Sequence, residues 1–320
     1  MINKELMDIL APITKEEQTI LDGKKDIDAD IYMDAGSSTI NSKKWLSAGK
    51  LITVRPHTRF VHFPKHSHNF IEVIYMCSGT TTHIVNGNKV VLKEGELLFL
   101  GQNVNQEILP AGINDVAVNF IVLPEFFDVS LDMLKDEETP LRAFIINSLK
   151  SNNSNSSYMH FKVADVLTIQ NLVENLIWTL IKGTSNKRKI TSFTMGLIFL
   201  QLMDYTDRLV LDDKEDETIL KVLKYADENY RDGSLTELAS SLHYDFSWLS
   251  REIKRKTGKT YTEIVQEKRL SQASFLLTNT DMNISDIANQ VGYDNISYFH
   301  KLFKKRFNMS PYKYKNSMLE

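Results

Sequence analysis

The stretch "ISDIANQVGYDNISYFHKLFKKRFN" at residues 284–308 decides the fold of the last third of the chain, because a diverged copy of it stands at residues 235–258. That copy reads "LTELASSLHYDFSWLSREIKRKTG". Leu235 aligns with Ile284 at the start of the copies, and Leu249 aligns with Phe299 after one inserted residue. Each copy predicts a short helix, a tight turn and a longer, basic helix.

The turn and the second helix have matching residue types in the two copies. His243 and Gly292 occupy the turn, where a positive φ is often needed and glycine adopts it most easily. One face of each second helix is apolar at i,i+4 spacing, and the opposite face is polar and basic. The apolar pairs are Leu249–Ile253 and Phe299–Phe303. The pattern predicts a helix-turn-helix, whose second helix enters the major groove of DNA.

Charge is distributed unevenly along the chain, although the formal net charge is only −3. From Phe246 to the end there are 13 Lys and Arg against 7 Asp and Glu, a balance of +6, so the preceding residues carry −9. A basic segment of this kind suits a phosphate-binding surface. A repeated helical hairpin with solvated lysines is also the unit of a solenoid, but two copies are too few for one, which favours DNA binding.

The last hundred residues resemble the DNA-binding domain of the AraC/XylS family of bacterial transcription regulators. The resemblance rests on "LSREIKRKTG", "RLSQASFLL", "ISDIANQVGY" and "YFHKLFKKRFNMSP". It implies two helix-turn-helix units, joined by a rigid helix at roughly residues 261–277, that set their second helices in successive major grooves. Asn308 stands where the family usually has glycine, and asparagine tolerates the left-handed conformation.

Positions in this motif predict which residues meet DNA. Arg251 is the expected base contact, because a guanidinium can bind guanine bidentately, whereas lysines 254, 304 and 305 are expected on phosphates. The full predicted DNA-binding set is Ser247, Ser250, Arg251, Lys254, Arg255, Ile296, Ser297, His300, Lys301, Lys304 and Lys305.

Residues 51–123 have the pattern of short β-strands separated by turns. Runs rich in Val, Ile, Phe and Tyr alternate with turn signals, and Asn86–Gly87 between two of them predicts a hairpin. Regular spacing of this kind indicates a β-sandwich or a small barrel. Within it, "HSHNFIE" at residues 66–72 puts His66 and His68 on one face of a strand, with Glu72 nearby.

This region resembles the cupin barrel common at the N-terminus of AraC/XylS regulators. "HSHNFIEVIYMCSG" is similar to the first cupin motif and "GNKVVLKEGELLFLGQNVNQ" to the second. The resemblance implies a pocket for a small-molecule effector, with His66, His68, Glu72 and Gln106 as the expected residues. Metal cupins usually have a further histidine where Gln106 stands, and an amide is a poor ligand for transition metals. We therefore expect no metal and no other cofactor, and we expect Trp45 in the core rather than as a sugar-stacking platform.

Helical periodicity replaces the strand pattern after Pro124. Between residues 161 and 182 apolar residues recur at 3-4-3-4 spacing, a stripe that suits either an intramolecular core or a dimer seam. Family resemblance implies dimerisation through helices after the cupin, so we expect a homodimer. The expected seam residues are Val166, Ile169, Val173, Leu176 and Leu180.

Polar connections at residues 151–157 and 183–189 separate the expected helices, and the acidic run "LDDKEDE" at 211–217 has the character of a linker to the last domain. The one cysteine, Cys77, excludes an intrachain disulfide and fits a reducing cytoplasm. The N-terminus lacks the pattern of a signal peptide, and the most apolar stretch, "FTMGLIFLQLM", is too short to span a bilayer. We expect a cytoplasmic protein without membrane contact.

Together these patterns predict a multidomain α+β protein. Its expected parts are an N-terminal arm and cupin-like sensor barrel (1–125), a helical dimerisation and linker region (126–213), and an all-α DNA-binding domain with two helix-turn-helix units (214–320). The expected function is a non-enzymatic, sequence-specific regulator of transcription, an activator in contact with RNA polymerase. Its barrel would sense a small molecule such as a sugar and control how the dimer presents its DNA-binding domains. Two alternatives stay open: a metal-dependent cupin enzyme, with a 2-His-1-carboxylate site, fused to a DNA-binding domain, and a DNA-binding regulator without an effector.

Overall fold

The computed structural model describes residues 2–127, 147, 158–183, 185–212 and 214–317. The described residues up to 212 form one compact unit, here called the barrel unit, and those from 214 onward form a second, here called the helical unit. The expected polar connection at 151–157 lies outside the described residues. None of the described helices is both long enough and apolar enough to cross a lipid bilayer.

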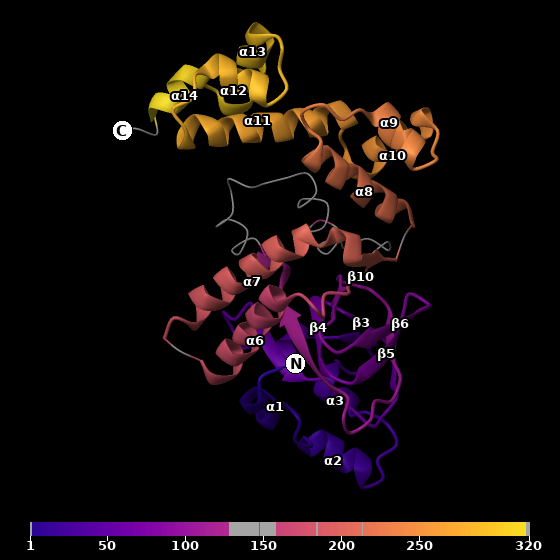
Figure 1. Cartoon of the computed structure of the whole chain (residues 1–320). Coiled ribbons are helices and arrows are strands. Elements are labelled where there is room, and N and C mark those ends of the chain that lie inside the picture. Colours follow the sequence, from indigo (N-terminus) through magenta and orange to yellow (C-terminus); the bar gives the residue numbers. More distant parts are fainter. Residues whose placement is uncertain (1, 128–146, 148–157, 184, 213, 318–320) are drawn as a thin grey trace. The chain divides into compact units, whose positions relative to one another are not determined.

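The barrel unit contains two β-sheets (Figure 1). The five-stranded sheet has the order β1-β3-β8-β5-β6, and the six-stranded sheet has the order β11-β10-β7-β4-β9-β2. The strands are β1 (Thr39–Ile40), β2 (Ile52–Pro56), β3 (Phe63–His68), β4 (Ile71–Ser78), β5 (Thr80–Val85), β6 (Asn88–Lys93), β7 (Leu97–Leu100), β8 (Gln106–Ile108), β9 (Val116–Val122), β10 (Tyr158–Phe161) and β11 (Leu209–Leu211).

Local sequence explains two features that position the site. Asn86 and Gly87 both have positive φ, 49° and 86°, as a type I′ turn requires, and they close the β5–β6 hairpin that the sequence predicted. The "HSHNFIE" stretch passes from β3 in one sheet to β4 in the other. His66 and His68 are both buried, as the alternation of side chains along a strand predicted.

Three short helices precede the barrel, α1 (Lys4–Leu10), α2 (Lys15–Leu21) and α3 (Ala29–Tyr32), and lie against the barrel unit (Figure 1). A capping box between Thr14 and Glu17 begins α2. Glu17 then accepts from the Arg59 guanidinium at 2.7 Å, and both side chains are buried. Separating the two side chains would leave a buried charge without a partner, which is strongly unfavourable. The pair therefore holds the arm against the barrel.

Two helices, α6 (Leu167–Lys182) and α7 (Lys187–Asp204), form a hairpin between β10 and β11 (Figure 1). Both strands pair antiparallel in the six-stranded sheet, β10 with β7 and with β11. The region expected to be helical and separate from the barrel therefore contributes two strands to the barrel's own sheet. The α6–α7 connection is short, because the basic residues of "GTSNKRK" already belong to the first turn of α7.

The stripe expected as a subunit seam lies inside the protomer. Its five residues are each at most 7% exposed within a single chain, with Ile169, Val173 and Leu176 at 1% or less. The spacing identified a buried helix face, but that face packs into the protomer's own core. The residues concerned are Val166, Ile169, Val173, Leu176 and Leu180.

The helical unit is built around α11 (Tyr261–Asn279), with α9 and α10 near its first turns and α12 to α14 along its other end (Figure 1). A capping box of Thr260 and Glu263 starts α11. The other helices are α8 (Lys214–Glu228), α9 (Leu235–Ser241), α10 (Phe246–Thr257), α12 (Ile284–Gln290), α13 (Ile296–Phe307) and α14 (Pro311–Ser317). The two copies of the repeat thus fold as α9–α10 and α12–α13, and the expected connecting helix is confirmed.

The backbone of the two copies agrees with their sequence alignment. His243 and Gly292 adopt φ of 58° and 89° in the turns, and Gly258 and Asn308 adopt φ of 73° and 58° at the ends of the second helices. Gly292 is also sterically required, because a Cβ there would lie 2.8 Å from the carbonyl oxygen of Arg231. Non-glycine residues at positive φ are uncommon, and asparagine is one of the few that tolerate it.

The acidic run at 211–217 is only partly a linker. Its first residue ends β11 and its last four begin α8, where carboxylates favour the positive end of the helix dipole. Asp216 pairs with Lys256 at 2.7 Å, and Glu215 pairs with Arg255 at 2.6 Å, so the run fastens α8 to α10. Asp212 accepts from Asn86 and Asn88 on the β5–β6 hairpin.

Candidate functional sites in the barrel and helical units

A small cavity of about 30 Å³ lies inside the barrel. Residues from both sheets and from the N-terminal arm surround it, which shows that the sheets face each other. This volume has room for about two water molecules. The lining residues are Tyr32, Ile40, Trp45, Arg55, His57, Thr58, Phe63, His66, Phe70, Glu72, Ile108, Asn119 and Ile121.

Two chains of hydrogen bonds order the polar side chains at the cavity. His66 and Gln106 are cross-strand partners on β3 and β8, and their side chains lie 3.2 Å apart. Gln106 Nε2 lies 2.9 Å from His83 Nδ1, and His83 Nε2 lies 2.8 Å from the Thr81 hydroxyl. The Gln106 amide is therefore committed to two imidazoles.

The second chain joins His57, which directly follows β2, to β9 and β4. His57 Nδ1 lies 2.9 Å from Asn119 Oδ1, and Asn119 Nδ2 donates to Glu72 Oε1 at 2.7 Å. Glu72 Oε2 then lies 3.5 Å from His68 Nε2 without a well-formed hydrogen bond. The chain thus ends at a carboxylate oxygen that has no donor.

Buried polar atoms without a partner gather at this cavity. Both ring nitrogens of His68, Nε2 of His57, Oε2 of Glu72 and Nε1 of Trp45 have none among the described residues. Leaving a buried polar atom unsatisfied costs roughly 1–3 kcal/mol, so such a cluster indicates water or a polar ligand. The site offers both hydrogen-bond donors and acceptors to an incoming molecule.

Burial keeps the imidazoles neutral. It lowers the pKa of His66 to about 4 and the pKa of His68 to about 3, and it also lowers the pKa values of His57 and His83. Burial raises the pKa of Glu72. A site with neutral histidines and a carboxyl group that resists ionisation suits a neutral hydroxylated ligand better than a charged one.

In the described part of the chain, no group of three or more His, Cys, Asp or Glu side chains is arranged to hold a metal ion. One geometric reason is visible at His66. His66 is bonded through Nδ1 to the Pro64 carbonyl and through Nε2 to Gln106.

The N-terminal arm closes the cavity through a latch of Glu16, Tyr32, Arg55 and Trp45. The Tyr32 hydroxyl donates to Glu16 at 2.6 Å, and the Arg55 guanidinium donates to the Tyr32 oxygen at 2.9 Å. The same guanidinium lies 4.2 Å from the centre of the Trp45 ring. Cation–π contact and hydrogen bonds thus hold two aromatic side chains of the arm over the cavity.

Of the four expected pocket residues, His66 and Glu72 line the cavity, whereas His68 and Gln106 lie behind them as their partners. Trp45 both packs against a core cluster and lines the cavity. Sequence reasoning did not select Tyr32, Arg55 or Asn119. Nothing in their spacing places them near "HSHNFIE", because the arm and β9 approach it only through tertiary contacts.

The predicted DNA-contacting residues of the first repeat lie on α10. Ser247, Arg251 and Lys254 are exposed and Ser250 is half-buried, while Leu249 and Ile253 are fully buried beneath them. Arg255 also lies on α10 but is held by Glu252 and Glu215. Its guanidinium therefore has a structural role in joining α10 to α8.

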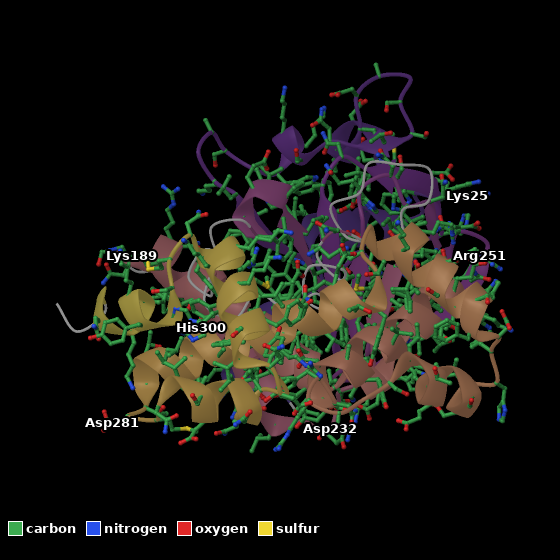
Figure 2. The ribbon with its side chains drawn as sticks, turned by 90° about the horizontal axis from the view of Figure 1, so that it is seen from above. Lys25, Lys189, Asp232, Arg251, Asp281 and His300 are labelled. Carbon is green, nitrogen blue, oxygen red and sulfur yellow. The ribbon has the colours of Figure 1, made fainter. Side chains whose placement is uncertain are left out.

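The residues of the second repeat lie on α13 in the same pattern. Phe299 and Phe303 are fully buried, whereas His300 is half-buried. Figure 2 labels Arg251 and His300, one on the second helix of each repeat. The exposed members of the predicted set on α13 are Ile296, Ser297, Lys301, Lys304 and Lys305.

Arg269 on α11 is a residue that the sequence did not single out. Its guanidinium donates to the carbonyl oxygens of Tyr230 at 2.7 Å, Arg231 at 2.6 Å and Gly292 at 2.8 Å. It also lies 5.4 Å from the centre of the Tyr293 ring. One side chain therefore ties the end of α8 and the turn of the second repeat to the connecting helix.

Comparison with known proteins agrees with this two-part organisation. Residues 48–121 match the family described as an AraC-like ligand binding domain, and residues 238–317 match a helix-turn-helix domain family. The first match spans most of the barrel strands. The second begins in α9 and ends with α14, so it includes both repeats.

Full-length relatives match across both units. The transcriptional activator PerA of Escherichia coli O127:H6 is 28% identical over 245 residues, covering 73% of this chain and 87% of the relative. The HTH-type transcriptional activator RhaS of Mannheimia succiniciproducens is 25% identical over 261 residues, covering 81% and 92%. RhaR of Escherichia coli, also an activator, is 22% identical, covering 78% and 86%.

Proposed function

The chain belongs to the AraC/XylS family of transcription regulators, and from that premise we propose that it is a sequence-specific activator whose barrel senses a small, neutral, hydroxylated molecule. The observation that carries the DNA-binding part is the duplicated basic second helix. Both α10 and α13 bury two apolar side chains and expose lysine or arginine on the opposite face. A single helix, α11, connects the two.

This arrangement suits two adjacent major grooves on one face of the duplex, about one helical turn apart. Selection of binding sites from random duplexes with the full chain tests this. We expect two conserved blocks, separated centre to centre by about 10 base pairs. Recovered sequences with one block, or with no preference, would contradict the two-groove proposal. As an activator, the bound protein would contact RNA polymerase.

The effector class follows from the cavity chemistry. Neutral imidazoles, an amide, a carboxyl group and the Trp45 ring offer hydrogen bonds and an aromatic wall, which is the surface that a sugar ring requires. Because the closed cavity holds only about 30 Å³, a monosaccharide requires the Tyr32–Trp45 segment to move outward. Effector binding would then change the latch between the arm and the barrel, and an effector acts only through such a difference between states.

A thermal-shift panel of neutral monosaccharides tests the sensor proposal, because a ligand present at 100 times its dissociation constant stabilises the native state by about 2.7 kcal/mol. Asn119→Leu should abolish the shift, since it removes the amide that bridges His57 and Glu72. Glu107→Gln is the matched control, because Glu107 is a half-buried residue that pairs with the exposed His62 and does not line the cavity. A panel without any shift would favour a regulator that acts without an effector.

We also propose a homodimer, formed by a different face from the buried stripe on α6. Ile190, Phe193 and Leu197 on α7 are 36%, 53% and 48% exposed, at the i, i+3, i+7 spacing of one helix face. Exposed large apolar side chains arranged in a row are unfavourable in water and mark an interaction surface. A second copy of the same helix is the simplest partner, because a two-fold axis makes one patch complementary to itself.

We propose no enzymatic activity for the barrel. The alternative of a cupin enzyme requires a metal, and the Gln106 amide, which is hydrogen-bonded to two imidazoles, works against one. Elemental analysis of the purified full chain tests this point. One equivalent of iron, manganese or zinc, lost in His68→Ala, would reverse the conclusion.

A further inference from the structure

A second, larger cavity lies in the barrel unit outside the barrel interior. Its volume is about 310 Å³, at the lower end of the range for ligand pockets, whereas the cavity inside the barrel has about 30 Å³. The lining comes from the start of β2, from Phe126 and from the α6–α7 hairpin. The lining residues are Gly49, Lys50, Leu51, Ile52, Phe126, Leu180, Ser185, Lys187, Arg188, Thr191 and Ser192.

The lining combines an apolar part with cations and contains no acidic residue. Four apolar side chains contribute to it, together with Lys50, Lys187 and Arg188. Among the residues that the structure describes, no carboxylate lies within ion-pair distance of these three cations. Elsewhere in this chain, cations such as Arg55, Arg59 and Lys256 are paired with acids at 2.7 to 3.4 Å.

The local electrostatics favour an anion. Burial and the neighbouring Lys50 lower the pKa of Lys187, so like charges face each other across the site. The first turn of α7 carries basic residues at 187, 188 and 189 and no acid, the reverse of what the helix dipole favours. Lys187 donates to the carbonyl oxygen of Leu180 at the end of α6, which explains this lysine in part but neither Lys50 nor Arg188.

We propose that this cavity binds a small organic carboxylate with an apolar body, either an aromatic acid or a medium-chain aliphatic acid. The carboxylate would lie among Lys50, Lys187 and Arg188 at the start of α7, and the apolar body would lie against Leu51, Ile52, Phe126 and Leu180. The size of the cavity supports this class. A dry cavity of about 150 Å³ holds benzene, so one of twice that volume accommodates a bicyclic or chain-like acid.

The site is separate from the proposed sugar pocket, so the two can be tested independently. Isothermal titration of the full chain with 2-naphthoate, and with 2-naphthamide as the neutral match, measures the contribution of the charge. We expect 2-naphthoate to bind at least about tenfold more tightly than the amide, since a charge-assisted hydrogen bond is much stronger than a neutral one. Equal affinities for the two compounds would overturn the proposal, and so would absence of heat with both 2-naphthoate and decanoate up to about 1 mM.

Variants locate the binding site. Lys187→Gln combined with Arg188→Gln should weaken 2-naphthoate binding by about tenfold or more, and Leu51→Trp should block it by filling the cavity. Lys189→Gln is the matched control, because Lys189 is an exposed residue on the same helical turn but does not line the cavity (Figure 2). Equal losses in the control and the double variant would show that binding depends on the overall charge of the protein, and would overturn the proposed site.

The thermal midpoint of unfolding shows whether a variant has lost binding or has lost its fold. Without ligand, Arg188→Gln should leave the thermal midpoint unchanged or raise it, because it removes an unpaired cation near Lys187. Asn119→Leu in the barrel should leave 2-naphthoate affinity unchanged. If Asn119→Leu keeps its fold but loses 2-naphthoate binding, the anion binds in the cavity inside the barrel, and the proposed second site is overturned.

Discussion

At the scale of single residues, the barrel and the helical unit place their polar groups in opposite ways. The barrel encloses neutral imidazoles that burial keeps from protonation, whereas α10 and α13 expose cations such as Arg251 and Lys304 to water, where they can meet phosphate. The two units should therefore respond differently to a change in pH or to a substitution. We expect protonation of a barrel histidine to change the stability of the barrel unit, and substitution of Arg251 on α10 to change DNA binding while leaving the core intact.

Lowering the pH should destabilise the barrel unit. The pKa values of His66 and His68 are about 4 and about 3 in the folded chain, below the value of about 6.5 in an unfolded one. Below pH 6.5 the unfolded state therefore binds more protons, and stability falls until the folded pKa is reached. At pH 5 the loss is up to about 2 kcal/mol for each of these histidines.

Thermal unfolding at pH 7 and pH 5 measures this loss. His68→Gln should reduce the difference between the two pH values, and His62→Gln should not, because His62 is exposed. A difference that persists unchanged in His68→Gln would show that other groups cause it.

Arg251 and Lys304 should differ in the kind of binding they support. Arg251→Ala should weaken binding to the selected site by roughly 1–3 kcal/mol and relax the preference at one base, because a bidentate contact to guanine is lost. Lys304→Ala should weaken selected and scrambled duplexes alike, since a phosphate contact carries no sequence information. Titrations on both duplexes distinguish the two, and equal losses for Arg251→Ala would exclude a base-reading role.

At the scale of elements, the helical unit depends on α11 and the side chains that join it to its neighbours. The turn of the second repeat is held at Gly292 by close backbone contact and by the Arg269 guanidinium. In the first repeat, Arg255 and Lys256 join α10 to the acidic start of α8 instead. The two repeats share a helical pattern but are anchored by different contacts.

Arg269→Met should therefore affect the second repeat most. It removes three charge-assisted hydrogen bonds to carbonyl oxygens while keeping an apolar stem, and we expect a loss of roughly 2–4 kcal/mol in stability. Hydrogen exchange should show the loss in α12 and α13 first. Arg306→Met, at an exposed position on α13, is the control and should change little. A uniform loss of protection across the unit would contradict a local role.

At the scale of the whole molecule, assembly determines how many DNA-binding units one complex presents. The helix face expected to join subunits is buried in the protomer, and the exposed row of Ile190, Phe193 and Leu197 on α7 remains for a partner. A dimer formed there would present two copies of the helical unit. Once one unit is bound, binding of the second would be intramolecular. The dimer would therefore bind a site with two halves more tightly than one unit binds a single half.

Phe193→Asp combined with Leu197→Asp should yield folded monomers with weakened binding to the selected site, measured by light scattering and titration. Val173→Asp combined with Leu176→Asp is the contrasting pair, because both side chains are at most 1% exposed and a buried charge there should unfold the barrel unit. An unchanged mass for the α7 pair would reject this surface as the dimer interface.

The amino-acid sequence alone determined those features that depend on neighbours along the chain. The repeat, the order of helix, turn and helix in its two copies, and the Asn86–Gly87 hairpin follow from periodicity and backbone preferences, which act over a few residues. The placement of His66 and His68 on one face follows from the geometry of a strand.

Only the tertiary structure decided which surfaces meet. The stripe on α6 has the same spacing whether it contacts its own core or a second subunit, and burial alone distinguishes the two. Tyr32, Arg55 and Asn119 reach the cavity from three distant segments, and three carbonyl groups from two loops converge on Arg269. The physical reason is that hydrophobic burial is not directional, so a sequence pattern specifies that a face is covered but not by what.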